Sequence, residues 1–462
     1  MDTKALRQKI LDLAIHGKLV PQDPNDEPAS VLLERIRTEK ERLIKEGKIK
    51  KGKKSAKTSD KPHYPFELPK GWAITDIGEL LINRDGERKP VSSAIRCKQK
   101  DKVYDYYGAA GVIDKVDEYL FDERLLLIGE DGANLLSKSK DNAFFADGKY
   151  WVNNHAHVLD ATDKSILDFV AIVINSIKLD DFITGSAQPK LSQDNLNKIP
   201  VMLPPINEQC RILKKVKHWF SLIAMIERCK DNLLETIKQT KFKILDLAIH
   251  GKLVPQDPND EPASELLKRI NPKAEITCDT PQYGKLPFVI PSSWEWVKLS
   301  GIAKSNIGLT YRPTDIVSTG VPVYRSNNIR NGKIDTTDLV KVSTKILEKQ
   351  LLHVGDLLIC ARNGSRNLIG KNAIISELKE PTSFGAFMAV CRSAYNQWIR
   401  IVLNSEYFDR YLDDSNSATI NQVTQKMLLA LPIPLPPHQE QHRIVAKIEE
   451  VFAQLDKIEA SL

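Results

Sequence analysis

The sequence predicts an α+β fold with two similar domains, separated by two long antiparallel coiled-coil helices in a pseudo-two-fold, cyclic arrangement. The first observation is an internal repeat: KILDLAIHGKLVPQDPNDEPAS occupies residues 9–30 and returns unchanged at residues 243–264. The second is a further repeat, in which residues 203–227 resemble residues 435–459. The third is the mixture of short β-rich runs, turns and helical stretches between these repeats. Such self-similarity indicates a duplicated frame that carries two intervening domains.

The chain begins with the first part of the frame. Residues 1–17 are expected to form an N-terminal helix that packs beside the C-terminal helix. Leu6, Ile10 and Leu13 follow helical spacing, and Gly17 lies where a helix would stop.

Residues 18–64 are expected to hold the repeated loop, a helix and a basic linker. Between Lys40 and Lys61 there are ten lysines and arginines against three acidic residues, an excess that equals the formal net charge of +7 for the whole chain. Two interpretations are open. The segment is either a solvated flexible linker or an arm that follows DNA phosphates and makes binding dependent on salt.

Residues 65–202 and 285–434 are expected to form α+β domains with the same order of elements. Both open on a similar segment, in which Trp72 and Trp294 occupy equivalent places. Helical stretches are expected near residues 165–182 and 396–413.

Residues 203–250 are expected to form a central spacer helix, residues 251–284 the second repeated loop and linker, and residues 435–462 the C-terminal spacer helix. A helix from about 206 to 249 would be roughly 65 Å long at 1.5 Å per residue, longer than the diameter of a small domain. Apolar residues recur at alternating steps of three and four, which keeps one seam facing a partner helix. The expected seam consists of Ile212, Val216, Trp219, Ile223, Ile226, Leu233, Ile237 and Ile244 in the middle, and of Ile444, Ile448, Val451, Leu455, Ile458 and Leu462 at the end.

The turns of both domains are rich in side chains that suit DNA bases and phosphates. Arginine presents a fork that matches O6 and N7 of guanine, and asparagine or glutamine matches N6 and N7 of adenine. A plain surface turn is the alternative for each residue, because asparagine and glycine favour turns without any ligand. The candidates in the first domain are Tyr106, Tyr107, Glu130, Lys138, Lys149, Asn153, Asn154, His155, Gln188 and Lys190. Those in the second domain are Arg325, Asn327, Asn328, Arg330, Arg362, Asn363, Arg366, Asn421 and Gln422.

Motifs for catalysis, cofactors and metal ions are missing. The sequence has no phosphate-binding GxxxxGK[ST] loop, no glycine-rich dinucleotide fingerprint and no amino-methyltransferase tetrad. The six cysteines are scattered, and the acidic turn at Glu130 and Asp131 is interpreted as a tight turn rather than a metal site. The sequence has neither an apolar run long enough for a membrane span nor a secretory peptide. We therefore expect a cytoplasmic chain without catalytic residues, cofactor, metal or membrane partner.

The repeats and the domain signatures resemble the specificity subunit of type I restriction–modification systems. The resemblance covers nearly the whole chain. It rests on two LPPxxEQxRI helices, the two KILDLAIHGKLVPQDPNDEPAS segments, and the runs YYGAAGVIDKVDEYLFDERLLLIGEDGAN and GDLLICARNGSRNLIGKNA. It implies two target-recognition domains that each read one half of a bipartite, asymmetric site in double-stranded DNA, with the spacer helices fixing the gap. It also implies two methyltransferase subunits that use S-adenosylmethionine and two restriction subunits that use ATP and Mg²⁺, so these cofactors belong to the partners.

Other functions are open. The chain could be an orphan specificity subunit, or a coiled-coil scaffold that assembles proteins without reading DNA. A self-contained methyltransferase or nuclease is a further alternative, against which the missing motifs argue. If the two domains read DNA, their half-sites should differ and lie about one helical turn, roughly 34 Å, apart. Arg362→Ala should then weaken recognition of one half-site only, whereas an equal loss on every sequence would indicate a phosphate contact.

Overall fold

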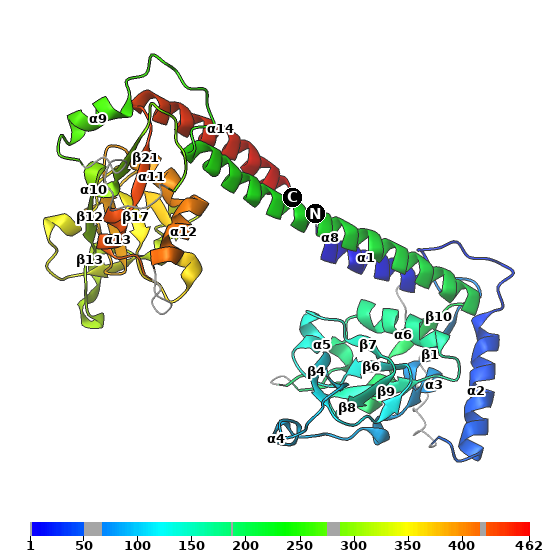
Figure 1. Cartoon of the computed structure of the whole chain (residues 1–462). Coiled ribbons are helices and arrows are strands. Elements are labelled where there is room, and N and C mark those ends of the chain that lie inside the picture. Colours follow the sequence, from blue (N-terminus) through cyan, green and yellow to red (C-terminus); the bar gives the residue numbers. More distant parts are fainter. Residues whose placement is uncertain (1, 50–66, 186–187, 275–286, 416–421) are drawn as a thin grey trace. The chain divides into compact units, whose positions relative to one another are not determined.

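The chain divides into two compact units in the computed structural model (Figure 1). The first unit comprises Met1–Cys229 and the second Lys230–Leu462. The boundary lies within α8 (Ile206–Ile249), a helix of 44 residues, which confirms the helix expected from about 206 to 249. The structure describes residues 2–49, 67–185, 188–274, 287–415 and 422–462.

In the first unit, α1 packs against the first half of α8 and runs antiparallel to it (Figure 1). Ile10 and Ala14 on α1 lie in the same apolar cluster as Ile212 on α8. Arg7 forms an ion pair with Glu227 at 2.7 Å, nearer the middle of α8. The frame helices of this unit are α1 (Thr3–Ile15), α2 (Ala29–Lys45) and the first half of α8.

The second unit repeats this frame with the second half of α8 in the place of α1. α14 runs antiparallel to it, because Lys230 contacts Leu462 at 2.6 Å while Lys241 contacts Asp456 at 2.6 Å. The frame helices here are the second half of α8, α9 (Ala263–Ile270) and α14 (His438–Ser461). The expected contact between the two chain ends involves both units and stays a prediction.

The first lobe, residues 73–203, fills the rest of the first unit with strands that pair in the orders β1-β10, β2-β9-β6-β7 and β4-β3-β8-β5. β6 buries all of its residues, and the apolar helix α6 packs on β6 and β7. The strands are β1 (Ala73–Asp76), β2 (Ile82–Asn83), β3 (Tyr104–Gly108), β4 (Gly111–Val116), β5 (Phe121–Asp122), β6 (Leu125–Gly129), β7 (Ala143–Ala146), β8 (Lys149–Val152), β9 (Ala156–Asp160) and β10 (Pro200–Leu203). The helices and 3-10 turns are α3 (Ile77–Leu80), η1 (Asp85–Glu87), α4 (Ser93–Arg96), α5 (Asn134–Ser137), α6 (Ser165–Ser176), η2 (Asp180–Phe182) and α7 (Gln193–Asn197).

The second lobe, residues 295–435, has strands that pair in the orders β11-β21, β12-β20-β17-β18 and β16-β13-β19, with an added hairpin β14-β15. The strands are β11 (Glu295–Lys298), β12 (Lys304–Ile307), β13 (Ile316–Tyr324), β14 (Ile329–Arg330), β15 (Lys333–Ile334), β16 (Val340–Val342), β17 (Leu357–Cys360), β18 (Asn372–Ile374), β19 (Ser383–Phe384), β20 (Met388–Arg392) and β21 (Pro432–Leu435). The helices and 3-10 turns are α10 (Leu299–Ile302), η5 (Pro313–Asp315), η6 (Ser326–Asn328), η7 (Glu348–Gln350), η8 (Arg366–Leu368), α11 (Asn396–Leu403), α12 (Glu406–Ser415) and α13 (Gln425–Ala430).

The two lobes share one topology. The sheet β2-β9-β6-β7 corresponds strand for strand to β12-β20-β17-β18, and both first and last strands of the lobes pair as β1-β10 and β11-β21. The parallel pair β3-β8 also has its counterpart in the parallel pair β13-β19. The expectation of two similar α+β domains with the same order of elements is confirmed.

Two expected helices are shorter than the sequence pattern suggested. The stretch near 165–182 forms α6, which ends at Ser176 and is followed by the separate turn η2. The stretch near 396–413 is two helices, because the chain breaks at Asn404 and Ser405, where the Ser405 hydroxyl donates back to the carbonyl of Val402 at 2.7 Å. Apolar periodicity alone does not show such a break.

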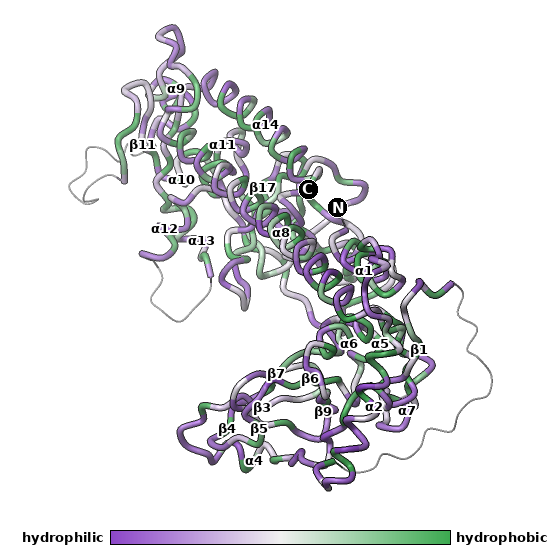
Figure 2. The backbone as a smooth tube through the Cα atoms, turned by 90° about the vertical axis from the view of Figure 1, so that its right-hand side faces the viewer, coloured by the Kyte–Doolittle hydropathy of each residue, from purple (hydrophilic) through white to green (hydrophobic). Residues whose placement is uncertain are grey.

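The apolar seam of the frame is only partly buried. Figure 2 shows apolar and hydrophilic residues alternating along α8 and α14, as expected of amphipathic helices. Ile212, Val216 and Ile223 are buried in the apolar cluster of the first unit, whereas Trp219 and Ile226 of the expected seam are exposed. No helix of the described ranges is long and apolar enough to cross a membrane.

The basic segment from Lys40 to Lys61 begins inside a folded element rather than in a linker. Lys40 lies on α2, and its ammonium donates to the carbonyls of Gly78, Glu79 and Leu81 at 3.0, 3.0 and 2.8 Å. Burial lowers the pKa of Lys40. Residues 50–61, which carry most of this positive charge, lie outside the described residues.

Candidate nucleic-acid interface

The lobes are attached to the frame by the same side-chain contacts in both units. Trp72 donates from Nε1 to the carboxylate of Glu208 at 3.0 Å, and Trp294 donates to Glu440 at 2.9 Å. Each indole lies just before the first strand of a lobe, and each carboxylate lies in the first turn of a frame helix. Burial raises the pKa of both glutamates. The equivalence of the two tryptophans, expected from the sequence, is confirmed.

The repeated loop is also held in the same way twice. Arg211 on α8 forms an ion pair with Asp26 at 2.5 Å, and Arg443 on α14 forms one with Asp260 at 2.6 Å. The hydrogen bond from Arg211 lowers the pKa of Asp26. The frame therefore presents the same loop in the same conformation on both units.

The first lobe has a polar corner where β6 ends and β9 begins. The backbone N–H of Glu130 donates to the carbonyl of His155 at 2.9 Å, and that of Leu191 donates to the carbonyl of Glu130 at 2.8 Å. His155 contacts the carboxylate of Asp131 through Nδ1 at 2.7 Å, and Lys190 forms an ion pair with Glu130 at 3.3 Å. We call Glu130, Asp131, His155 and Lys190 the first corner.

The second lobe has a corner at the matching place, where β17 ends and β20 begins. The backbone N–H of Ala361 donates to the carbonyl of Phe387 at 2.9 Å, and that of Val423 donates to the carbonyl of Ala361 at 2.7 Å. The guanidinium of Arg362 lies over the ring of Phe387, 5.5 Å from its centroid. We call Ala361, Arg362, Phe387 and Gln422 the second corner.

These backbone contacts define which residues of the two corners are equivalent. Glu130 corresponds to Ala361, and His155 corresponds to Phe387. The isolated bridge between Asp131 and Lys190 likewise matches the bridge between Arg362 and Gln422. The structure thus brings three of the predicted residues, Glu130, His155 and Lys190, together in the first lobe, and two, Arg362 and Gln422, in the second.

The first corner is stiffened by an ion network that the sequence did not reveal. Arg88 pairs with Glu130 at 2.6 Å, and His157 contacts Asp85 at 2.6 Å through Nδ1 and the carbonyl of Leu191 at 2.8 Å through Nε2. Burial alone would raise the pKa of Asp85, but hydrogen bonding and charge from His157, together with the charge of Arg88, lower it. No local motif could have indicated this network, because its members come from three separate segments.

Ligand atoms of Asp85, Glu130 and His157 lie within 4.8 Å of one another, a spacing that would also suit a metal ion. The cations Arg88 and Lys190 already neutralise the carboxylates of this cluster. The arrangement is that of a satisfied ion-pair network, in keeping with the interpretation of the acidic turn as structural.

Three of the predicted DNA-binding residues are buried and hold the chain. The Tyr106 hydroxyl accepts from the backbone N–H of Val91 at 2.9 Å, and Asn153 accepts from the N–H of His155 at 2.7 Å. Asn328 accepts from the N–H of Arg325 at 2.9 Å. Since each is at most 4% exposed, each holds the backbone from within, and their contact with DNA stays a prediction.

Other candidates of the first lobe differ in accessibility. Lys138 is half-buried and donates to the carbonyl of Asn175 at 3.3 Å, and burial lowers its pKa. Burial raises the pKa of Tyr107, whose ring packs edge-on against Tyr150. Lys149 is exposed and lies over the Tyr119 ring at 4.7 Å. Asn154 and Gln188 are exposed.

The remaining arginines predicted in the second lobe each have an acidic partner. Arg325 pairs with Asp338 at 3.2 Å, Arg330 pairs with Asp335 at 3.0 Å, and Arg366 pairs with Asp413. Asn327 is exposed, and Asn363 donates to the Ser326 hydroxyl at 3.3 Å. Asn421 lies outside the described residues.

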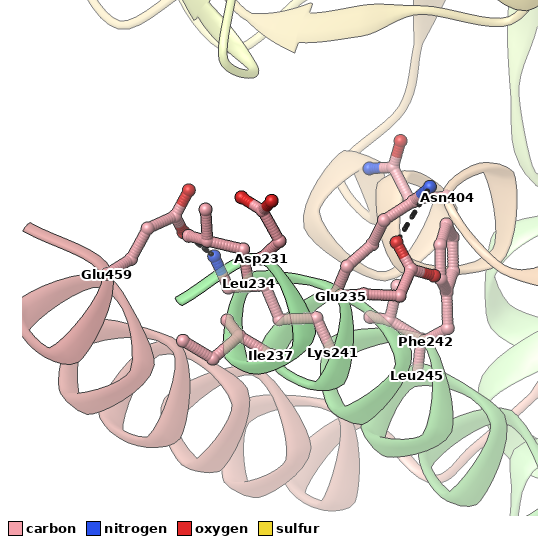
Figure 3. A pocket seen from close by; sticks show the side chains of 10 residues that line it. Asp231, Leu234, Glu235, Ile237, Lys241, Phe242, Leu245, Asn404 and Glu459 are labelled. Atoms are coloured by element: carbon pink, nitrogen blue, oxygen red, sulfur yellow. Dashed lines mark hydrogen bonds and ion pairs between the residues drawn. The ribbon is translucent and has the colours of Figure 1, made fainter. Parts of the chain in front are cut away.

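A surface hollow of about 630 Å³ lies in the second unit between the frame helices α8 and α14 and Asn404 of the lobe (Figure 3). Charged side chains surround an apolar floor, and Lys241 reaches Glu459 at 3.1 Å across one side. No residue of either corner lines it, so the hollow is separate from the candidate interface. Its lining residues are Asp231, Leu234, Glu235, Ile237, Lys238, Lys241, Phe242, Leu245, Asn404 and Glu459.

Several known proteins are similar to this chain over nearly its full length. The specificity subunit of the type I restriction enzyme EcoAI from Escherichia coli is 29% identical over an alignment that covers 98% of this chain and 90% of that protein. The specificity subunit of EcoEI, also from Escherichia coli, is 28% identical, with 99% and 90% covered. Among solved structures, a chain described under the assembly and conformational transition of the type I R-M system shares the fold with a TM-score of 0.56, at 18% identity and with 86% of this chain and 94% of that chain covered.

The family comparison matches both halves of the molecule. The model of the type I restriction modification DNA specificity domain fits residues 69–236 and again residues 291–462. Each match contains one lobe and one of the frame helices that begin with the LPPxxEQxRI motif. With two such domains on a duplicated frame, the chain belongs to the family of type I restriction–modification specificity subunits.

Proposed function

We propose that each lobe reads one half of a bipartite, asymmetric DNA target and that the frame holds the two lobes at a fixed spacing. The observation that carries this proposal is the contrast between corners of identical backbone design and different side chains. One corner offers carboxylates and a histidine, and the other offers an arginine on an aromatic ring. Side chains at base edges determine which base is preferred, so two different corners should select two different half-sites.

The chain acts in this proposal as a non-catalytic subunit. Two methyltransferase subunits bind the duplicated frame and supply S-adenosylmethionine chemistry, and two restriction subunits supply ATP- and Mg²⁺-dependent cleavage. The repeated loop supports two equivalent partners, because a surface that is presented twice can bind two copies of one protein. The names of the similar proteins, which are specificity subunits of restriction enzymes, support partners of this kind. Such a complex would act on cellular DNA in the cytoplasm.

Accessible residues at and around the corners carry the proposed DNA contacts. Arg362, Gln422, His155 and Lys190 present polar atoms at the corners themselves. Tyr106, Asn153 and Asn328 support turns from within. In this proposal the other candidate residues contact the sugar-phosphate backbone of DNA or the flanking bases. They are Tyr107, Lys138, Lys149, Asn154, Gln188, Arg325, Asn327, Arg330, Asn363, Arg366 and Asn421.

The test is single-molecule sequencing of methylated adenines in cells that hold the full chain with its methyltransferase. Cells that lack only this chain are the control. The expected result is a split, asymmetric motif that is methylated only when the chain is present. Methylation that is unchanged by removal of the chain would contradict the proposed function and favour an orphan subunit or a scaffold that does not read DNA.

A further inference from the structure

We propose that one matched pair of side chains in each lobe sets opposite base preferences at corresponding positions of the two half-sites. The pairs are Asp131 with His155 in the first corner and Arg362 with Phe387 in the second. The first pair accepts a hydrogen bond from an exocyclic amino group, for which cytosine N4 is the usual partner of a carboxylate. The second pair donates to O6 and N7 of guanine. This inference rests on the proposed function and assigns a specificity-determining position within it.

The two pairs occupy the same place in the fold. Each lies between the central strands β6 and β9, or their counterparts β17 and β20, at the edge where one strand ends and the other begins. Two backbone hydrogen bonds and one isolated bridge are shared, with N···O distances of 2.9 and 2.8 Å in the first corner and 2.9 and 2.7 Å in the second. A difference in ligand preference must therefore come from the side chains.

Arg362 differs from the other arginines that were predicted to bind DNA. Arg325, Arg330 and Arg366 are each engaged by an aspartate. Arg362 is exposed, and among the described residues it has no acidic partner within ion-pair distance. Its five N–H donors are available to a ligand that offers two acceptors side by side.

Phe387 fixes the direction of this free guanidinium. Phe387 is 59% exposed, so its ring is accessible together with the guanidinium of Arg362 that lies over it. The Arg362 guanidinium lies over the ring, where cation–π attraction is favourable. Because this contact already restricts the side chain, less conformational entropy is lost when a ligand binds. The pair is therefore a preorganised donor.

In the first corner the acceptor is Asp131, whose side chain is 18% exposed and therefore less accessible than that of Arg362. Arg88 and Lys190 engage Glu130, whereas among the described residues Asp131 pairs with no lysine or arginine and contacts His155. Asp131 uses Oδ2 for His155, and among the described residues no hydrogen bond is made to its Oδ1. The side chain of His155 is 48% exposed, and its Nδ1 contacts Oδ2 of Asp131 at 2.7 Å.

The sign of the charge indicates what Asp131 selects. A carboxylate near DNA phosphates is repelled in general, so it weakens binding to most sequences. It is favourable only where an amino group lies within reach, and it disfavours bases that present acceptors. Arg362 has the opposite effect at the matching position, because its N–H groups favour bases that present hydrogen-bond acceptors. The two corners thus discriminate by the same geometry with reversed hydrogen-bonding roles.

The main experiment exchanges the pairs between lobes in the full chain with its methyltransferase. One variant carries D131R with H155F, and the other carries R362D with F387H. A random-sequence duplex DNA library, selected for binding and then sequenced, reads out the preference at every position. The first variant should change one position of one half-site from a base with an amino group to guanine, by about tenfold to a hundredfold. The second should reverse this at one position of the other half-site.

Matched controls separate base reading from net charge. D117R changes the charge of the first lobe by the same amount as D131R, and K349D changes the charge of the second by the same amount as R362D; both sites are exposed and lie outside the corners. These controls should change affinity on all sequences alike and leave the preferred bases unchanged. The same altered preference in the control and the exchange variant would overturn the proposal.

A conservative variant keeps the proposal testable if an exchange variant does not fold. R362Q replaces the guanidinium fork by an amide that suits adenine N6 and N7. One position of one half-site should then change from guanine to adenine, and the other half-site should be untouched. An unchanged motif in R362Q would overturn the inference while chain-dependent methylation still supports the proposed function. Loss of the proposed function itself would appear differently, as no chain-dependent motif in the unmodified protein.

Discussion

The two copies of the frame share both side chains and contacts, whereas the corners of the two lobes share only their backbone contacts. In the frame, side chains are preserved together with their contacts: the indole-to-carboxylate distance is 3.0 Å for Trp72 and Glu208, and 2.9 Å for Trp294 and Glu440. In the corners of the lobes, the backbone contacts are preserved while the side chains differ. The backbone N–H of Glu130 donates to the carbonyl of His155 at 2.9 Å, and the backbone N–H of Ala361 donates to the carbonyl of Phe387 at 2.9 Å.

This difference indicates two kinds of selection on one molecule. In the proposed function the frame presents one surface to each of two partners, so its exposed side chains cannot change independently in the two copies. A lobe that must read its own sequence needs a constant backbone to aim the side chains, and free choice of the side chains themselves. Variants of the spacer helix and of the junctions between frame and lobes test this division.

The largest effect is expected from lengthening α8 alone. Insertion of one heptad after Lys230 would extend the helix by about 10 Å at 1.5 Å per residue, without changing either lobe. Because the proposed function requires two half-sites at a fixed separation, recognition of the original split motif should be lost. Sequencing of methylated adenines measures this, with N232A, an exposed substitution in the same helix, as the control. Methylation of the unaltered motif at the normal level would exclude the role of α8 as a spacer.

Much of the frame could be predicted from sequence because its signals are local and repeated. The identical segments at 9–30 and 243–264 defined the copies, and helical spacing located α8 within its observed bounds. Trp72 and Trp294 could be recognised as equivalent from their flanking residues. The common topology of the lobes followed from the order of their elements, although α11 and α12 were merged.

The candidate site was less predictable because burial depends on contacts that are distant in sequence. Tyr106 and Tyr107 are neighbours of the same type, yet only Tyr106 is fully buried, whereas Tyr107 packs half-buried against Tyr150. Asn328 has the composition of an exposed turn but is 1% exposed, because it closes the turn from within. Phe387 was missed because an isolated aromatic residue gives no signal until its neighbour Arg362 is placed above it.

The two tryptophan contacts should not be equally sensitive to loss of the indole N–H. Glu440 also accepts from Gln256 at 2.5 Å, whereas Oε1 of Glu208 has no hydrogen-bond partner among the described residues. W72F would leave a buried carboxylate with no side-chain donor, at a loss of about 1–3 kcal/mol in the free energy of unfolding. W294F should reduce the free energy of unfolding by less than W72F does. Hydrogen–deuterium exchange in the full chain measures the stability of each unit separately. Equal losses of stability in W72F and W294F would argue against this asymmetry.

The two glycines that end the first helix of each frame copy should be equally intolerant of a side chain. Gly17 and Gly251 have φ angles of +64° and +66°, and an added Cβ would lie 2.6 and 2.4 Å from Cγ of Pro69 and Pro291. G17A and G251A should each reduce the free energy of unfolding by about 1–3 kcal/mol, as judged by urea denaturation. The control is G47A, since Gly47 also has a positive φ but has open space around it, so only the backbone strain applies. If G47A is as destabilising as G17A, the contact with proline contributes nothing.

The smallest effect concerns the pH dependence of the two acidic groups at one frame junction, which should have opposite signs. Burial raises the pKa of Glu208 above its usual 4.5, so protonation stabilises the folded state below that value, and this contribution is lost as the pH rises through the folded pKa. The hydrogen bond from Arg211 lowers the pKa of Asp26 below its usual 3.8, so its contribution is present above that value and is lost as the pH falls through the folded pKa.

Relative to the unmodified chain, E208Q should therefore gain stability as the pH is raised from about 4 towards neutrality, because the variant no longer has a buried group that must ionise. D26N should lose relative stability as the pH is raised from below the folded pKa of Asp26 to its usual 3.8, because the unmodified chain regains its ion pair with Arg211 as Asp26 ionises. Thermal unfolding at a series of pH values measures both differences, and E440Q should behave as E208Q does because burial also raises the pKa of Glu440. A pH-independent difference for E208Q would show that Glu208 is ionised to the same extent in the folded and unfolded chain. If the stability differences of E208Q and D26N changed with pH in the same direction, burial of Glu208 and ion pairing of Asp26 would not be the causes of the two pKa shifts.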